Sequence, residues 1–233
     1  MLGGAWLFTL SSAAYAPRPT QASTANMRQA KFLYYPAVTA SAVASSDYLL
    51  QKLDAGRGSF LLHTWAMAAQ TERANGFSPA SEAIGDGALR MKYLADELPK
   101  LVSTAKILGL CEKGTLSFDN LEEPHASMAE RLSRTSLQGA VSAGKGSAVA
   151  FVSRWEDHVS IDRCVVNPRF LTLGEEAEAA LLQHIVETAV SAGLDEVKLR
   201  PGYQVNGSQF YESCGFFASD AEGDEWLYHR TVE

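Results

Sequence analysis

The chain has 233 residues, of which 46% are hydrophobic and 20% are charged. This length and composition allow one large domain, or one domain with an appendage, and exclude a wholly disordered or fibrous protein. The net charge of −7 argues against a general nucleic-acid-binding protein, and the lack of any run near eighteen apolar residues argues against a membrane span.

Residues 1–46 contain no Asp or Glu, whereas all 27 acidic residues follow them. Ala, Ser and Thr supply 21 of these 46 positions, and basic residues are sparse. This composition is typical of an organelle transit segment, and Ala14-Tyr15-Ala16-Pro17 is similar to the cleavage region of the two-part presequences of algae with secondary plastids. We therefore expect localisation to an organelle, a plastid rather than a mitochondrion. The alternative is a disordered N-terminus of low complexity.

Residues 47–140 are predicted to be mostly helical. Apolar residues at helical spacing follow Asp47, and we expect this first helix to end at Gly56 and Gly58. A longer helix starts near Ser81 and breaks or kinks at Pro99, after which residues 100–110 form another helix. Residues 111–124 are rich in turn-forming and charged residues, which indicates a loop. The histidines and cysteines of the chain are dispersed, so we predict no metal site.

Residues 141–233 alternate between strand and helix patterns, which predicts an α/β domain built on a mixed sheet. Apolar runs over 146–155 and 159–167, separated by a polar turn, predict an antiparallel hairpin. A helix is expected over 175–192, with Gly193 just after its C-terminal end. A strand over 196–200, a short helix over 206–213, and strands over 215–218 and 226–230 complete the predicted order.

Several residues of this domain resemble the core of the GCN5-related N-acetyltransferases, the GNAT fold. They include Val166 and Pro168, a loop with Gly174, and above all the run from Phe210 to Phe216 with the pattern F-Y-E-x-x-G-F. The resemblance covers residues 146–231 and implies a GNAT-like mixed sheet flanked by helices. The segment 161–176 is also similar to the acetyltransferase-like C-terminal domain of FkbH-type proteins, in which an acyl group passes to a carrier protein.

The resemblance implies that the chain binds acetyl-CoA or another acyl-CoA. In the family, the end of a strand pairs with the pantetheine arm, and the next helix points its first amides at the pyrophosphate. Arg169 offers a further phosphate contact, or alternatively a surface salt bridge, and Asn206 matches an asparagine near the cofactor. The residues that the resemblance assigns to cofactor binding are Cys164, Val165, Val166, Arg169, Leu173, Gly174, Glu175, Glu176 and Asn206.

Three residues are candidates for catalysis. Tyr211 matches the family position whose phenol protonates the departing thiolate, although a tyrosine here also serves to pack the short helix on the sheet. Asp162 and Glu156 are the carboxylates available as a general base for an amine, and we favour Asp162 because it lies on the strand that faces the cofactor. The implied acceptor is an amine on a small molecule or a protein, and an acyl carrier protein is a further candidate partner.

Acidic residues at the start of the predicted helix favour an alternative. Glu175, Glu176 and Glu178 would lie in its first turn, where they would satisfy the helix dipole and repel a pyrophosphate. The alternative is a catalytically degenerate protein that keeps the GNAT fold and binds or scaffolds a partner. An active enzyme requires two strands to separate near residues 164–178, whereas strands paired along their full length would leave only the architecture.

Overall fold

The computed structural model describes residues 48–74, 85–142, 145–168, 171–200, 208–219 and 225–229, all within one compact unit, Thr39–Glu233. Within these residues a seven-stranded sheet has the order β1-β2-β3-β4-β5-β7-β6. Strands β1 to β4 pair antiparallel, β4 and β5 pair parallel, and β7 pairs antiparallel with both β5 and β6. The strands are β1 (Leu49–Leu53), β2 (Thr135–Ser142), β3 (Lys145–Arg154), β4 (Val159–Val166), β5 (Glu196–Leu199), β6 (Phe217–Ala218) and β7 (Trp226–His229).

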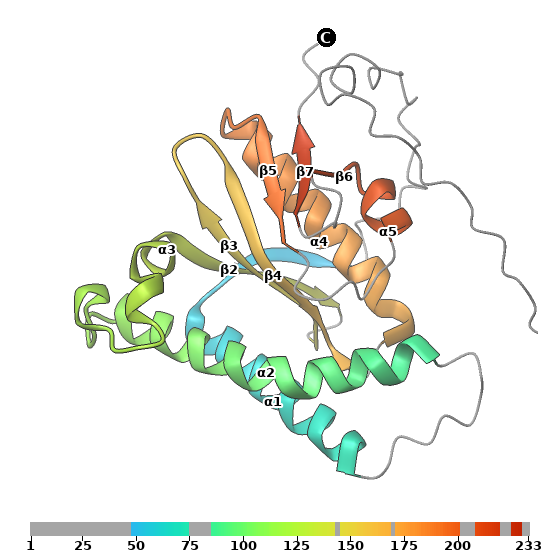
Figure 1. Ribbon diagram of the computed structural model, residues 1–233, viewed down its shortest axis with the longest axis horizontal. Coiled ribbons are helices and arrows are strands. Elements are labelled where there is room, and N and C mark those ends of the chain that lie inside the picture. Colours follow the sequence, from blue (N-terminus) through green and yellow to red (C-terminus); the bar gives the residue numbers. More distant parts are fainter. Residues whose placement is uncertain are drawn as a thin grey trace, which may run out of the picture. The chain divides into compact units, whose positions relative to one another are not determined.

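Helices cover both faces of the sheet (Figure 1). Helices α1 (Ala55–Ala74) and α2 (Gly85–Glu112) pack together on one face, and α4 (Leu171–Ser191) covers the other. Shorter elements are η3 (Phe118–Asn120), η4 (Ala126–Met128), α3 (Ala129–Arg134) and α5 (Ser208–Ser213). This arrangement confirms the predicted α/β class, a mixed sheet flanked by helices with a helical region before most of its strands.

The middle strands are buried on both faces. Residues 148–152 of β3 are all buried, and successive side chains of a strand point to opposite faces. Val149 and Phe151 therefore join the hydrophobic cluster beneath α1 and α2, here called the α1–α2 cluster. Ala150 and Val152 join the cluster beneath α4, here called the α4 cluster. Burial on both faces explains why β3 is a continuous apolar run rather than an alternating pattern.

The sequence prediction was wrong at the start of this unit. Leu49–Leu53, expected as a helix, is strand β1 and pairs with β2. Gly56 and Gly58, expected to end that helix, lie in the first turn of α1. Gly58 permits a close approach to the sheet, because a Cβ at this position would lie 2.4 Å from Leu137 Cδ1. Pairing with β2 thus overrides the helical spacing of a short segment.

The predicted break at Pro99 was also wrong, because α2 continues through it. Pro99 lies on the exposed side of the helix, whereas Leu94, Leu98 and Leu101 are buried beneath it. An interior proline costs about 3 kcal/mol through a lost hydrogen bond and a steric clash. Packing before and after the proline offsets this cost, so the two predicted helices form a single one. Of the loop predicted over 111–124, the first two residues belong to α2 and residues 118–120 form a short 3-10 helix, while the others form turns and irregular structure.

The second half of the chain follows the predicted order more closely. The β3–β4 hairpin is antiparallel, Gly193 has a φ of 79° just after α4, and β5, α5, β6 and β7 lie where strands and a short helix were expected. The predicted domain boundary at residues 140 and 141 falls within β2. The predicted leader 1–46 lies outside the described residues, so its role and the organellar localisation stay predictions. None of the helices that the structure describes has the length and apolar composition of a membrane span.

Candidate functional site

Strand β4 pairs with β3 along its whole length but with β5 only at its start. Its β5 partners end at the pair of Ile161 and Leu199, and the Arg200 N–H then donates to the Ile161 carbonyl at 3.1 Å. Among the residues that the structure describes, no β5 residue pairs with β4 beyond this point (Figure 1). We call the remainder of β4, residues 162–166, the open edge. Among the described residues, pairing between β4 and β5 therefore ends just before the segment 164–178, where the sequence resemblance predicted that two strands separate.

The register shows which main-chain groups face the side where β5 has ended. The Asn167 N–H donates to the Ser147 carbonyl of β3 at 2.9 Å, and Val165 lies opposite Val149. Because main-chain groups alternate between the two sides of a strand, those of Val165 and Asn167 point to β3. The N–H and carbonyl of Val166, and those of Cys164, point the other way. The strand end named from the sequence thus presents backbone groups toward the opening.

A β-bulge marks the point at which β4 leaves β5. Phe151 pairs with Arg163 and Val152 pairs with Ile161, so Asp162 is the extra residue on β4. Its carboxylate accepts hydrogen bonds from Ser153 and, at 3.0 Å, from Ser160. The Asp162 side chain is 14% exposed and also pairs with Arg131 at 3.3 Å. Asp162 thus lies on β4 directly after its last pair with β5, and its predicted role as a base stays a prediction.

The Asp162 carboxylate closes a polar ring on the α1–α2 face of the sheet. The Thr135 hydroxyl donates to the Arg131 carbonyl at 2.8 Å and lies 2.9 Å from the Ser153 hydroxyl. Ser153 is fully buried and reaches Asp162. The ring joins the end of α3, the start of β2, β3 and the bulge of β4. These contacts hold Asp162 in place. Its carboxylate interacts with three donors, on Ser153, Ser160 and Arg131, of the roughly four that a carboxylate accepts.

Charged and phenolic side chains from α2 meet the same part of β4. Burial and, to a smaller extent, the Glu97 carboxylate raise the pKa of Tyr93 to about 12, although the Arg163 guanidinium acts in the opposite direction. Arg163 Nη1 donates to the Asp162 carbonyl at 2.7 Å. Glu97 pairs with Lys100 at 3.0 Å. Tyr93, Glu97 and Arg163 thus form a partly buried charged group next to the bulge.

Tyr211 lies on the opposite face of the sheet from Asp162. It is 2% exposed and belongs to the α4 cluster. Its ring centroid lies 5.3 Å from that of Trp226 on β7 and 5.2 Å from that of Phe210. Its packing role is therefore evident, and the predicted role as an acid stays a prediction. Asn206 lies outside the described residues.

The structure does not bring Glu156 to the open edge. Glu156 is exposed in the turn between β3 and β4. This turn lies just before the first residues of β4, which are the ones that pair with β5. At about 3.3 Å per residue, Val159 is roughly 16 Å from Cys164 along the strand. Of the two carboxylates named from the sequence, only Asp162 lies beside the opening.

Helix α4 begins earlier than predicted. It starts at Leu171, and its first turn contains no acidic residue. The resemblance assigned the unpaired amides to Leu173 through Ala177. A helix that starts at Leu171 leaves about its first four N–H groups without partners in the helix, so the Leu173 amide remains among them and those of the later residues do not. The side chains of Leu173, Gly174 and Glu175 lie outside the described set, as does all of Arg169.

The two later glutamates of this helix face different surroundings. Glu176 is exposed, whereas Glu178 is 5% exposed. Glu178 lies near Cys214, whose pKa is raised to about 11 by burial, with a further contribution from Glu178. Glu175, Glu176 and Glu178 therefore lie after the first turn of α4, and the prediction that they occupy that turn and repel a pyrophosphate there was wrong.

Sequence reasoning missed Arg131, Ser153, Ser160, Tyr93 and Arg163. Ser153 and Ser160 carry a weak signal, because each is a polar residue inside an apolar strand pattern. Arg131 and Tyr93 carry none, since their neighbours at the site are distant in sequence. The bulge that turns Asp162 and Arg163 to their places depends on pairing between strands, which the sequence does not display.

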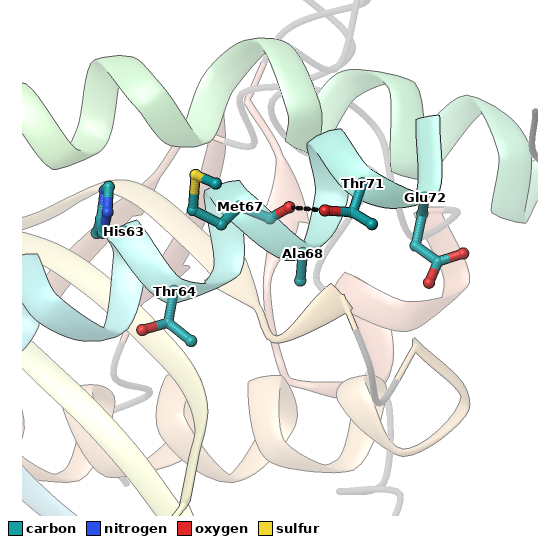
Figure 2. A pocket seen from close by; sticks show the side chains of 6 residues that line it. All are labelled: His63, Thr64, Met67, Ala68, Thr71 and Glu72. Atoms are coloured by element: carbon teal, nitrogen blue, oxygen red, sulfur yellow. Dashed lines mark hydrogen bonds between the residues drawn. The ribbon is translucent and has the colours of Figure 1, made fainter. Parts of the chain in front are cut away.

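A separate hollow of about 330 Å³ lies on α1. Its described lining residues all come from that helix (Figure 2), namely His63, Thr64, Met67, Ala68, Thr71 and Glu72. These side chains stand along one side of α1, and most of them are exposed. None of them belongs to β4 or contributes to the open edge.

Comparisons with known proteins give similarity of fold. No protein-family model matches the chain. No curated protein matches it. Solved structures similar to it include the PaiA N-acetyltransferase of Thermoplasma acidophilum in complex with coenzyme A, at 14% identity over 78% of this chain and 99% of that one, with a TM-score of 0.45. A GCN5-related N-acetyltransferase from Rhodopseudomonas palustris is 14% identical over 78% and 96%, with a TM-score of 0.42.

A third similar structure covers less of this chain. The ribosomal-protein-S18-alanine N-acetyltransferase from Escherichia coli is 17% identical over 49% of this chain and 81% of that one, with a TM-score of 0.37. At these identities the similarity describes the fold alone. These similarities do not show a relationship to FkbH-type proteins.

Proposed function

We propose that the chain is an acyl-CoA-dependent N-acyltransferase of the GNAT type. The observation that carries the proposal is the open edge of β4, where strand pairing with β5 ends at Ile161 while β4 continues to Val166. The solved structures named above include an N-acetyltransferase in complex with coenzyme A. The open edge itself is a feature of the strand pairing and does not depend on that similarity.

The open edge suits an extended ligand that carries amides. The pantetheine arm of coenzyme A is such a chain, and an extended segment adds to an open strand through main-chain hydrogen bonds. The N–H and carbonyl of Val166 point toward the position of the added segment. An arm bound there would bring its thioester toward the bulge at Asp162, because the bulge is where the space between β4 and β5 closes.

The start of α4 suits the other end of the same ligand. This helix follows β4 after a few residues, and the first N–H groups of a helix lack partners within it. Such amides bind phosphates, and the first turn contains no acidic residue that would repel them. The strand edge and the helix start together fit a long ligand that ends in a pyrophosphate.

The proposed reaction is a direct transfer. The amine nitrogen of the acceptor forms a bond to the thioester carbonyl carbon, the carbon–sulfur bond breaks, and the thiolate takes a proton from the Tyr211 phenol. The proton of the amine passes to Asp162, directly or through water, since about one lone pair of that carboxylate stays available. Tyr211 and Asp162 lie on opposite faces of the sheet and would approach the reacting carbon from opposite sides.

Replacing Tyr211 with phenylalanine is expected to lower the rate of acyl transfer by about 10² or more while leaving coenzyme A affinity unchanged. The phenyl ring keeps the packing against Trp226, so the fold is retained. Release of free thiol from acetyl-CoA in the presence of an amine panel measures the rate, and calorimetry measures the affinity. Tyr228→Phe, a second tyrosine of the same face, is the matched control. An unchanged rate in Tyr211→Phe would contradict the proposed role of the phenol.

Reversing the charge of Glu176 is expected to strengthen coenzyme A binding about two- to fivefold at low salt. The residue is exposed near the start of α4, so Glu176→Lys replaces a repelled charge with an attracted one. Calorimetric titration at two salt concentrations measures the effect, which salt should reduce. Glu187→Lys, farther along the same helix, serves as the control. Equal effects of the two variants would place the pyrophosphate away from the start of α4.

There is one alternative for the acyl donor and one for the activity, and acyl-transfer assays test both. An acyl carrier protein would present the same arm without the nucleotide, as the sequence similarity to FkbH-type proteins implied. In that case acyl transfer from a loaded carrier would exceed transfer from acetyl-CoA. A catalytically degenerate scaffold would show no thiol release with any donor.

A further inference from the structure

Arg163 is held next to the place where β4 leaves β5. Its register position is opposite Phe151, immediately after the bulge at Asp162. Its guanidinium acts on the Tyr93 hydroxyl of α2, so the side chain lies on the α1–α2 face of the sheet. The side chain is half-buried. A partly desolvated cation thus lies beside the proposed position of the thioester.

The described residues supply Arg163 with no counter-ion. A guanidinium has five N–H donors, and the hydrogen bond described for Arg163 runs from Nη1 to the Asp162 carbonyl. None of the ion pairs within the described part of the chain includes Arg163. The Asp162 carboxylate pairs with Arg131, and the Glu97 carboxylate pairs with Lys100. A partly buried cation in this state is suited to bind an anion.

We propose, on the basis of the proposed acyl transfer, that the acceptor is an α-amino acid and that Arg163 binds its carboxylate. The planar guanidinium matches a carboxylate through two parallel hydrogen bonds. In an α-amino acid the amine and the carboxylate share one carbon atom, and on β4 the residue proposed to receive the amine proton directly precedes Arg163. Binding the carboxylate at Arg163 therefore places the amine beside Asp162.

The test uses acceptors that differ only in the carboxylate: phenylalanine with phenethylamine, tyrosine with tyramine, and lysine with cadaverine. We expect the wild-type protein to acetylate each amino acid with a kcat/KM about 10- to 100-fold above that of its decarboxylated partner. Arg163→Gln should reduce this preference to about threefold or less. Arg163→Lys should retain part of it, because a lysine keeps the charge without the planar pair of donors. Arg154→Gln, an exposed arginine near the β3–β4 turn, should retain all of it.

Several results would overturn the inference. Equal or better acetylation of the decarboxylated amines by the wild type would show that no carboxylate is recognised. A loss of coenzyme A affinity in Arg163→Gln, with the acceptor preference unchanged, would assign the guanidinium to a phosphate of the donor. Absence of coenzyme A binding by the wild type would remove the proposed function and this inference with it. Binding of coenzyme A together with transfer to simple amines alone would remove only the inference.

Discussion

Val166→Pro is expected to weaken coenzyme A binding by about tenfold or more while leaving the fold in place. The Val166 N–H points to the open edge, so a proline removes this donor and puts its ring where the extended arm would lie. The hydrogen bonds between β4 and β3 use the main-chain groups of Val165 and Asn167 on the other side of β4. A proline is tolerated in a strand where the N–H that it removes faces no partner strand. Because Val166 is 2% exposed, the smaller side chain should lower the free energy of unfolding by about 1 to 2 kcal/mol.

Val165→Pro is the matched control, because the Val165 N–H points to β3. This variant should lose about 3 kcal/mol or more of stability through the broken ladder and the ring clash. Calorimetric titration with coenzyme A and chemical denaturation of both variants measure the two effects. We expect affinity to fall by about tenfold or more in Val166→Pro. Wild-type affinity in a folded Val166→Pro protein would show that the arm does not pair with β4.

Asp162→Ala is expected to destabilise the protein by about 2 to 4 kcal/mol and to stop acyl transfer. The substitution leaves the buried Ser153 hydroxyl without its carboxylate partner and leaves Arg131 without its counter-ion. The polar ring that joins α3, β2, β3 and the bulge then loses its central acceptor. Loss of the ring should also loosen the bulge, which sets where β4 separates from β5.

Asp157→Ala controls for removal of a carboxylate from the same hairpin. Asp157 lies in the exposed β3–β4 turn, where the hydrogen bond from His158 lowers its pKa. We expect its replacement to leave the denaturation midpoint and the transfer rate near the wild-type values. Chemical denaturation and the thiol-release assay compare the two variants. A fully stable and active Asp162→Ala protein would exclude both the structural and the chemical role of this carboxylate.

The parts of the fold that the sequence predicted are those specified by local patterns. The β3–β4 hairpin follows from two apolar runs and a polar turn, and the end of α4 follows from a glycine that adopts a positive φ at Gly193. The errors occurred where contacts with segments distant in the sequence determine the secondary structure. Strand β1 depends on its pairing with β2, and α2 continues through Pro99 because of packing on either side of it.

The candidate site divides in the same way. The resemblance implied Cys164 to Val166, Asp162 was favoured from its place on the same strand, and the register puts all of them at the open edge. The partners of Asp162 could not be predicted, because Arg131 and Ser153 reach it only through the packing of α3 and β3 against β4. The start of α4 was placed too late because Gly174 suggested a loop, whereas the helix includes it.

Amide hydrogen exchange at Val166, measured by NMR with and without coenzyme A, tests the open edge most directly. In the free protein the Val166 amide should exchange faster than that of Val165, which points into the β3 ladder. Saturating coenzyme A should slow exchange at Val166 about tenfold or more and leave Val165 nearly unchanged. A Val166 amide that is already as protected as Val165, and that coenzyme A does not alter, would contradict the account.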